Sequence, residues 1–423
     1  MSTRRQALLS AYWFAVSAHW TAILVVLLPA QAQQLGGDAF KGRTLGLVLL
    51  AGALVSMLVA PIAGALSDRL RSRLGRRRPF LIIGTLGNMI ALLGLAYLAK
   101  PQMLGLYILA FMAVEFFNNI ATAPYSALIP DVVPADQRGS ASGWMGLMTM
   151  LGNFLGGIMG LLLGSIGGIA GAYWLLAAIL LIGMLITVFS TEEPPPPPLP
   201  LPPFAWRPFL RSLADPFKSR DFTWVFWTRF LMVMGTFIVQ EFLIYYLDDV
   251  VGAPFRIFGL SMNEAAEAVS LAILALLIGA ILSSLVAGVV SDRFGRKKIV
   301  YFSGALQALV VTVFLFAHSY PLAIAMGVVF GLGYGAYISV DWALATDVLP
   351  SMDDYARDMG VWHVALTLPQ VIGAPIAGVL LDLGQAYGPG VGLPTLGYTL
   401  LFSLALLFFI LGTVFVSRIK RAR

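Results

Sequence analysis

Hydrophobic residues in this chain occur in long continuous runs, not in the alternating pattern of half-buried strands. Continuous runs of about 20 residues are typical of helices that cross the hydrocarbon core of a bilayer, where strands survive only as closed barrels. The pattern therefore predicts an all-α membrane protein with twelve transmembrane helices. The twelve runs cover residues 7–30, 44–66, 80–99, 102–128, 140–165, 169–190, 222–247, 268–290, 299–317, 321–346, 358–382 and 395–417.

The composition fits a chain whose main solvent is lipid. Hydrophobic residues make up 59% of the chain and the mean hydropathy is +0.86. Charged residues make up only 11%, against about 25% in a typical soluble domain.

Cysteine is absent, which excludes disulfides, thiolate metal sites and cysteine nucleophiles. The three histidines form no cluster that would bind a metal, and no nucleophile–base pair is recognisable. We therefore predict neither an enzyme nor a bound cofactor.

The first hydrophobic run has a second interpretation. Arg4 and Arg5 precede it and Ala30-Gln31-Ala32 ends it, as in a secretory signal peptide with its cleavage site. The run is longer than a signal core, and many similar runs follow. We therefore interpret it as the first membrane span.

Lysine and arginine residues are concentrated in alternate connections between the runs and at both chain ends. The opposite connections contain only Lys41, Arg43, Lys100 and Arg256. Because basic loops tend to stay in the cytoplasm, we predict both termini there, in a multi-pass inner or plasma membrane protein. The net charge of +6 would also suit nucleic-acid binding, but the basic residues lie in short loops. We therefore predict the lipid bilayer, and no nucleic acid, as a partner.

A proline-rich segment divides the twelve runs into two sets of six. Glu192 and Glu193 are followed by five prolines, Pro194–Pro198, and then by Leu-Pro-Leu-Pro-Pro. Such a segment is either a semi-rigid spacer or a ligand for a partner protein, and we favour the spacer. The sequence thus predicts a six-helix bundle over residues 1–190, a cytoplasmic linker over 191–221 and a second six-helix bundle over 222–423.

Two sequence motifs occur once in each half, in the same order. The first follows spans two and eight and reads Gly64-Ala-Leu-Ser-Asp68-Arg69, then Gly75-Arg-Arg-Arg78, in one half and Gly288-Val-Val-Ser-Asp292-Arg293-Phe-Gly295-Arg-Lys-Lys298 in the other. The second ends spans four and ten and reads Ser126-Ala-Leu-Ile-Pro-Asp131-Val-Val-Pro134 and Trp342-Ala-Leu-Ala-Thr-Asp347-Val-Leu-Pro350. The repeats indicate two duplicated six-helix halves of the kind that enclose a central site.

The repeated loops resemble the signature loop of the major facilitator superfamily, and with the six-plus-six layout the resemblance covers the whole chain. The loop Ser67–Phe80 is similar to that of plant sucrose–proton symporters, and Glu115-Phe-Phe-Asn118-Asn119 resembles their Asp-x-x-Asn-Asn segment. The stretch Pro124–Pro130 resembles melibiose-type carriers. The resemblance implies membership of the glycoside–pentoside–hexuronide:cation symporter group. Plant sucrose carriers have an arginine at the position of Ser126, which argues against sucrose itself.

Glu115 lies near the middle of the fourth run, where an ionised carboxylate costs about 2.5 kcal/mol or more to insert. Such groups usually face a water-filled cavity, and a low dielectric favours the neutral acid. Asn119, Thr122 and Ser126 follow at spacings that place them on the same helix face. We interpret Glu115 as the proton-coupling residue. The alternative is a carboxyl that hydrogen-bonds to a neighbouring helix and serves packing.

Arg229 is the only basic residue well inside a predicted span, and Asp341 lies at a similar depth in the tenth run. We predict that the two residues pair. The pair is either a site for which substrate competes or a static contact that fixes helix register.

The other candidate substrate-binding residues are polar or aromatic positions within the runs. Tyrosines on the same face as Asp341 suit a sugar, whose C–H face packs on rings while its hydroxyls form hydrogen bonds. The alternative for each aromatic residue or histidine is helix packing. With Arg229 and Asp341, the predicted set is His19, Trp20, Asn118, Asn119, Gln240, Tyr334 and Tyr337.

Glu241 shares a face with Tyr245 and Asp248 nearer the outside, which suits an outer vestibule or gate as well as a coupling role. Carboxylates beside clustered basic groups at the cytoplasmic ends of spans suit latches, because arginine binds carboxylates through several hydrogen bonds at once. We predict that they hold the outward-facing state. The predicted gating residues are Asp68, Arg69, Arg76, Asp131, Asp292, Arg293, Arg296 and Asp347.

The predicted function is proton-coupled symport of a sugar, a glycoside such as a disaccharide, by a monomer through alternating access. Three alternatives remain: a carrier of another organic solute in either direction, a sodium-coupled sugar carrier, and a membrane receptor that transports nothing. Melibiose-type carriers have carboxylates in span two, and here span two has none before Asp68.

Overall fold

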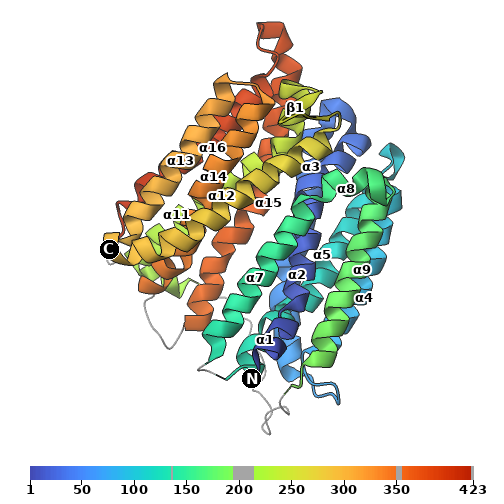
Figure 1. Ribbon diagram of the computed structural model, residues 1–423, viewed down its shortest axis with the longest axis vertical. Helices are drawn as coiled ribbons and strands as arrows, with labels where there is room; N and C mark the ends of the chain where they lie inside the picture. The colour runs from blue at the N-terminus through green and yellow to red at the C-terminus, as the bar shows by residue number, and fades with distance from the viewer. Residues whose placement is uncertain (135–136, 194–213, 349–354, 421–423) are drawn as a thin grey trace. The chain divides into compact units, whose positions relative to one another are not determined.

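The computed structural model describes residues 1–134, 137–193, 214–348 and 355–420, most of them helical (Figure 1). The chain divides into two compact units. Unit 1 comprises Met1–Asp38 and Leu47–Pro203, and unit 2 comprises Ala39–Gly46 and Phe204–Arg423. The boundary between Pro203 and Phe204 falls in the predicted linker, whose proline run lies outside the described residues. The limits of the predicted bundles and linker stay predictions.

Unit 1 is built from helices. They are α1 (Thr3–Leu9), α2 (Ala11–Ala22), the π-helical turn η1 (Ile23–Leu27), α3 (Leu28–Arg69), α4 (Arg78–Leu98), η2 (Pro101–Met103), α5 (Leu104–Ser126), α6 (Leu128–Val132), α7 (Arg138–Gly157), α8 (Met159–Ile166) and α9 (Gly168–Ser190). Residues 39–46 of α3 group with unit 2.

Unit 2 contains helices and one small hairpin. The elements are η4 (Asp215–Lys218), α11 (Arg220–Tyr246), the π-helical turn η5 (Leu247–Val251), β1 (Phe255–Ile257), β2 (Leu260–Met262), α12 (Ala265–Phe294), α13 (Arg296–Phe316), α14 (Tyr320–Asp347), α15 (Tyr355–Tyr387), η6 (Pro389–Val391) and α16 (Leu396–Val416).

The helices coincide with the predicted spans. Among the described residues, ten helical segments are long and apolar enough to cross a membrane, or eleven if α7 and α8, which meet at 56°, count as one bent span. The first segment, Thr3–Arg69, covers two predicted spans, and Gly37 breaks its helical geometry with φ 65° and ψ 177°. If α7 and α8 count as one span and Thr3–Arg69 is divided at Gly37 into two, the described residues contain the predicted twelve spans. The predicted fold class is confirmed.

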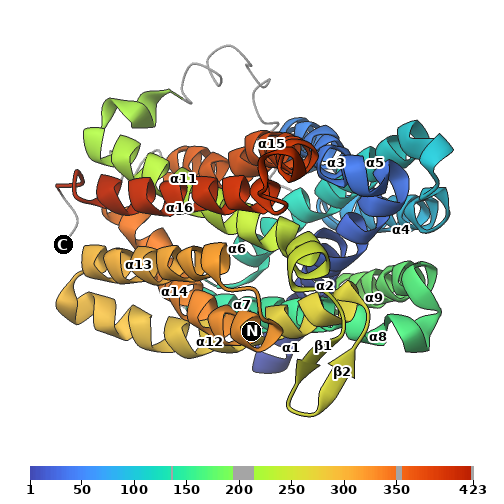
Figure 2. The same cartoon turned by 90° about the horizontal axis from the view of Figure 1, so that it is seen from above.

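The hairpin is the one departure from a purely helical chain among the described elements. β1 and β2 pair antiparallel, with Phe255 opposite Met262, and Figure 2 shows them beside α12 and α14. Phe258 and Gly259, both with positive φ, connect the strands. The sequence analysis missed these strands because each has only three residues, too few for a recognisable alternation.

Glycines let the helices of unit 1 approach closely. α2 packs against α7 and α9, and α4 packs against α5 and α9. A Cβ at Gly152 of α7 would lie 2.3 Å from the carbonyl oxygen of Phe14 in α2. A Cβ at Gly84 of α4 would lie 2.6 Å from the backbone nitrogen of Ala121 in α5. Any larger residue at these positions would push the helices apart.

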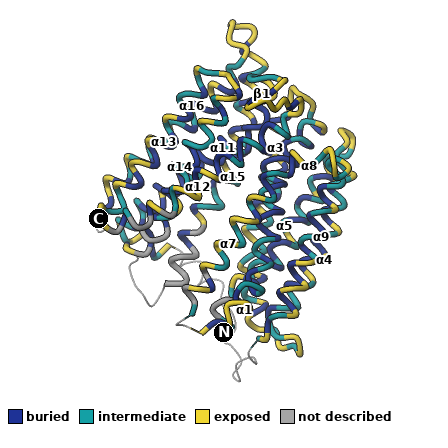
Figure 3. Tube along the Cα trace, viewed as in Figure 1, coloured by how far each residue is buried: buried dark blue, intermediate teal, exposed yellow. Residues whose placement is uncertain are grey.

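The helices of unit 2 bring distant segments of the chain together. α13 packs against α14 and α16, α12 packs against α14, and α11 contacts α14, α15 and α16. Many exposed positions on the spans of both units are apolar, including Ile90 (73% exposed), Phe189 (83%) and Phe316 (81%) (Figure 3). Apolar surface of this kind is expected where side chains face lipid.

Candidate functional site

The carboxyl group of Glu115 lies between α5 and α3 in unit 1. Asn119, one helical turn later, donates from Nδ2 to Glu115 Oε2 at 3.1 Å, and its own Oδ1 accepts from Ser56 of α3 at 3.2 Å. A Cβ at Gly52 would lie 2.9 Å from Glu115 Cγ, so this glycine makes room for the side chain. No cation pairs with Glu115 within the described part of the chain. The group is thus a partly buried carboxyl with an amide donor and no counter-ion.

The rest of the predicted polar stripe on α5 does not join this group. Thr122 donates to the carbonyl oxygen of Asn118 at 2.8 Å, and Ser126 donates to that of Ala123 at 2.7 Å. Hydroxyl groups in helices often bond to their own backbone in this way. The structure therefore brings Glu115 and Asn119 together, whereas the hydroxyls further along the helix are occupied locally.

Two other predicted residues of unit 1 have buried side-chain atoms without hydrogen-bond partners among the described residues. Neither ring nitrogen of His19 has a partner, and its ring lies edge-on to Trp20 with centroids 4.8 Å apart. Asn118 is 4% exposed, and its Oδ1 is also unpaired. Such groups need an acceptor or donor from a ligand or water.

Unit 2 contains the predicted pair of Arg229 and Asp341. Arg229 of α11 donates from Nη1 to Oδ2 of Asp341 on α14, and Tyr337 donates to Oδ1 at 2.9 Å. Both carboxylate oxygens are therefore engaged. The side chains of Arg229 and Asp341 are only 7% and 4% exposed, so the ion pair is buried. Tyr334, one turn before Tyr337, is half-buried.

Trp362 of α15 is part of this cluster, although the sequence analysis did not single it out. The guanidinium carbon of Arg229 lies 3.5 Å from the centroid of the Trp362 ring. Trp362 is 5% exposed, and its Nε1 has no hydrogen-bond partner among the described residues. Nothing in the spacing of α15 relates it to α11, so only the packing of the two helices could reveal this contact.

Further along α11, uncharged side chains form hydrogen bonds that connect this helix to α13. Thr236 forms a 3.0 Å hydrogen bond with Gln307 of α13, which donates to Ser303 at 3.0 Å. Gln307 is fully buried, and sequence reasoning missed it; a glutamine within the ninth run was the available signal. Gln240, one turn beyond Thr236, is half-buried.

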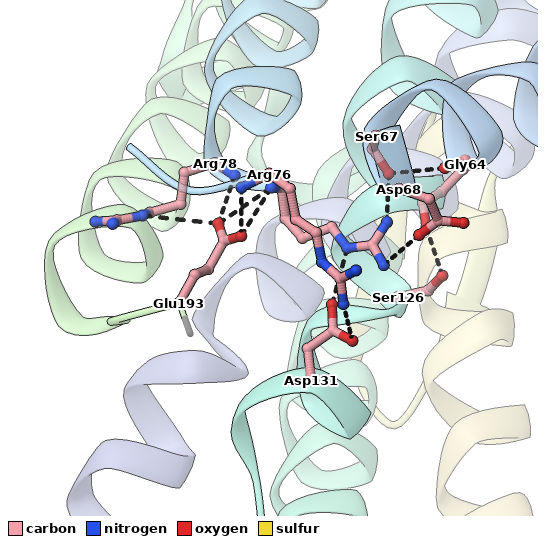
Figure 4. A network of polar contacts seen from close by, with 10 residues as sticks. Gly64, Ser67, Asp68, Arg76, Arg78, Ser126, Asp131 and Glu193 are labelled. Carbon is pink, nitrogen blue, oxygen red and sulfur yellow. Dashed lines mark hydrogen bonds and ion pairs between the residues drawn. The ribbon is translucent and has the colours of Figure 1, made fainter. Parts of the chain in front are cut away.

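The predicted latch residues of unit 1 meet after α3 (Figure 4). Asp131 accepts from Arg76 at 2.6 Å and from Arg77 Nε at 2.9 Å, and Arg77 also pairs with Asp68 at 2.6 Å. Arg69 is exposed. Arg77 was not predicted, because in a run of three arginines the sequence does not say which side chain turns inward.

Glu193, three residues after the end of α9, binds the same cluster. Its carboxylate accepts from the backbone N–H groups of Arg76, Arg77 and Arg78 at 2.8, 2.9 and 2.8 Å (Figure 4). These N–H groups lie at the N-terminus of α4, where the helix dipole also favours a negative charge. From the sequence, Glu193 was predicted only to be part of the linker over 191–221.

Unit 2 repeats the contact of unit 1. Arg296 pairs with Asp347 at 2.5 Å, as Arg76 pairs with Asp131. Each arginine follows a glycine with positive φ, Gly75 at 94° and Gly295 at 93°, a conformation that favours glycine. Of the other predicted gating residues, Arg293 is exposed, whereas the side chain of Asp292 is not among those that the structure describes.

A sequence profile of the MFS/sugar transport protein family matches residues 40–419, which is most of the chain. The chain belongs to this family. The family resemblance that the signature loops and the span-four segment predicted is therefore confirmed.

Relatives of this MFS protein include named carriers. A general alpha-glucoside permease of Schizosaccharomyces pombe is 33% identical over 129 residues, 27% of this chain and 23% of the permease. Sucrose transport protein SUT2 of Oryza sativa subsp. indica is 26% identical over 420 residues, 83% of this chain and 82% of that protein. The matches to the permease and to SUC4 of Arabidopsis thaliana span less than a third of those proteins. The crystal structure of nucleoside transporter NupG, 16% identical, has the same fold, with a TM-score of 0.70 over 99% of this chain and 100% of that one.

Segment 39–46 of this MFS protein carries a further charged cluster, within unit 2. Lys41, 2% exposed, pairs with Asp249 of η5 at 2.6 Å and lies 4.9 Å from the ring centroid of Tyr245. Asp382 of α15 accepts from the backbone N–H groups of Gly42 and Arg43 at 2.9 and 2.8 Å. Glu241, the predicted outer-gate residue, is 3% exposed, and its Oε2 is unpaired among the described residues.

Proposed function

We propose that this protein is a sugar–proton symporter in which Glu115 binds the transported proton. One observation carries the proposal: within the described residues, Glu115 is a carboxyl inside a membrane span with an amide donor and no counter-ion. An ionised carboxylate without a counter-ion is costly in such a medium, so a proton is the simplest neutralising ligand.

Coupling requires only that proton and sugar favour the same conformations. The ionised carboxylate of Glu115 accepts from Asn119, and the neutral acid also has a proton to donate. Protonation therefore changes the hydrogen bonds that Glu115 can form with the Asn119 amide, and this amide accepts a hydrogen bond from Ser56 of α3. This link is the route by which a proton would bias the packing of the two helices.

The transported solute is a neutral glycoside in this proposal. Support comes from the sugar-transport family and from relatives named for sucrose and alpha-glucosides. In unit 2, the rings of Tyr334, Tyr337 and Trp362 and the amide of Gln240 suit a sugar. In unit 1, Asn118 and His19 offer hydrogen-bonding groups that also suit one. The paired residues Arg76–Asp131 and Arg296–Asp347 act as latches that must open during the cycle.

The test uses purified protein in proteoliposomes with sucrose and methyl α-D-glucopyranoside. An imposed proton gradient should drive accumulation by the wild-type protein. Glu115→Gln should abolish accumulation but retain counterflow, because the substituted protein can exchange sugar without moving a proton. Glu264→Gln, at an exposed carboxylate before α12, is the control and should behave like the wild type. Accumulation by Glu115→Gln against a gradient, or accumulation that follows sodium instead, contradicts the assignment.

A further inference from the structure

The cluster around Arg229 contains more hydrogen-bond donors than acceptors. Among the described residues, Arg229 Nε, Trp362 Nε1 and the hydroxyl of Thr228 are buried without a partner. The oxygens of Asp341 accept from Arg229 Nη1 and Tyr337, and none of the three unpaired donors forms a hydrogen bond with them. Leaving buried donors unpaired costs free energy, and folded proteins rarely do so without a ligand or water at the site.

The geometry brings two of these donors to one place. With the guanidinium carbon of Arg229 3.5 Å from the Trp362 ring centroid, the guanidinium lies over one face of the indole. The ring edge that bears Nε1–H is left for another contact, and Arg229 Nε is bonded to the guanidinium carbon that lies over the same ring. Thr228 is adjacent in the chain on α11.

The charge of the cluster defines the ligand. Arg229 and Asp341 neutralise each other, so a site next to the pair favours a neutral molecule over an ion. The free groups are mainly N–H donors, so the ligand must present acceptor oxygens. We propose that Trp362 is a specificity-determining residue whose Nε1–H donates to an oxygen of a neutral glycoside bound beside Arg229. This inference rests on the proposed function and adds the residue that selects the sugar.

The experiment compares sucrose and methyl α-D-glucopyranoside with their monodeoxy and monofluoro derivatives in a calorimetric binding assay on purified protein. A fluorine substituent accepts hydrogen bonds weakly and cannot donate them, whereas a deoxy position neither accepts nor donates a hydrogen bond. At the oxygen that Trp362 contacts, the wild-type protein should lose about tenfold in affinity for the deoxy sugar and less for the fluoro sugar. Trp362→Phe should bind the parent sugar about tenfold more weakly than the wild-type protein does. At that position the variant should bind the parent sugar and its deoxy derivative with equal affinity, so the loss on deoxygenation (the deoxy penalty) disappears.

Trp13→Phe is the matched control. It removes another buried indole N–H without a partner, in α2 of unit 1, and should leave the deoxy pattern unchanged. If Trp362→Phe does not fold, nitrogen-15 indole spectra of the wild-type protein replace it. Sugar should then move one of the nine tryptophan N–H signals downfield.

Three results overturn the inference. They are equal sugar affinity in the wild-type protein and Trp362→Phe, a deoxy penalty that survives in Trp362→Phe at every position, and indole signals that sugar does not move. Transport by the wild-type protein in these cases leaves the proposed function standing. Failure of the wild-type protein to bind either sugar contradicts the proposed function and, with it, the glycoside assigned to this cluster.

Discussion

Two carboxyl groups within the spans differ in their partners. Asp341 is held by Arg229 and Tyr337, whereas Glu115 has only the amide of Asn119. A fully engaged carboxylate serves as a fixed anion, and a group without a counter-ion is free to exchange a proton. The sequence predicted that both residues matter, but only their partners distinguish the two roles.

The Arg229–Asp341 pair gives a prediction about stability. Asp341→Asn leaves the guanidinium buried without its counter-ion and should destabilise the protein by about 3 kcal/mol or more. Arg229→Gln combined with Asp341→Asn removes both charges and should recover a large part of that loss. Thermal unfolding of the purified variants measures both effects. A double variant no more stable than Asp341→Asn alone would mean that the two charges do not stabilise each other.

At the scale of elements, the start of α4 depends on a residue that follows α9. Glu193 accepts hydrogen bonds from three backbone N–H groups, and two of them, from Arg77 and Arg78, are among those that a helix N-terminus leaves without an intrahelical partner. The same loop carries the arginines that bind Asp131 and Asp68. Glu193 therefore positions the loop that the signature motif encodes.

Glu193→Gln should destabilise unit 1 by about 1 kcal/mol, because an amide oxygen accepts less strongly than a carboxylate and carries no charge for the helix dipole. Glu192→Gln is the matched control, since Glu192 is the preceding residue and is exposed. Thermal unfolding compares the two variants with the wild type. An equal melting temperature for Glu193→Gln and Glu192→Gln would contradict the capping role.

At the scale of the whole molecule, the predicted topology is directly testable because the chain has no cysteine. A single cysteine at Ser2 should react with a membrane-impermeant maleimide only after permeabilisation, because we expect both termini in the cytoplasm. A single cysteine at Ser261, exposed in strand β2, should react in intact cells. The opposite labelling pattern would reverse the predicted orientation.

The sequence by itself determined the helical fold and its repeat. Apolar runs long enough to cross a bilayer leave few alternatives to helices, so the spans coincide with the observed segments. The duplicated Gly-Arg and Asp motifs predicted two equivalent halves, and an arginine–aspartate pair between these motifs is present in each half. The apolar runs are local in the sequence and the motifs are repeated in it, so both can be recognised from a single sequence.

Only the tertiary structure decided which side chains complete each site. Trp362 reaches Arg229 from α15, Gln307 reaches Thr236 from α13, and Glu193 reaches the start of α4 from the segment after α9. Each contact joins segments far apart in the chain, and helix packing, not periodicity, fixes which faces meet. A run of three arginines or a lone tryptophan looks the same in sequence whether it faces lipid, water or a partner, so its role appears only when the neighbouring helix is in place.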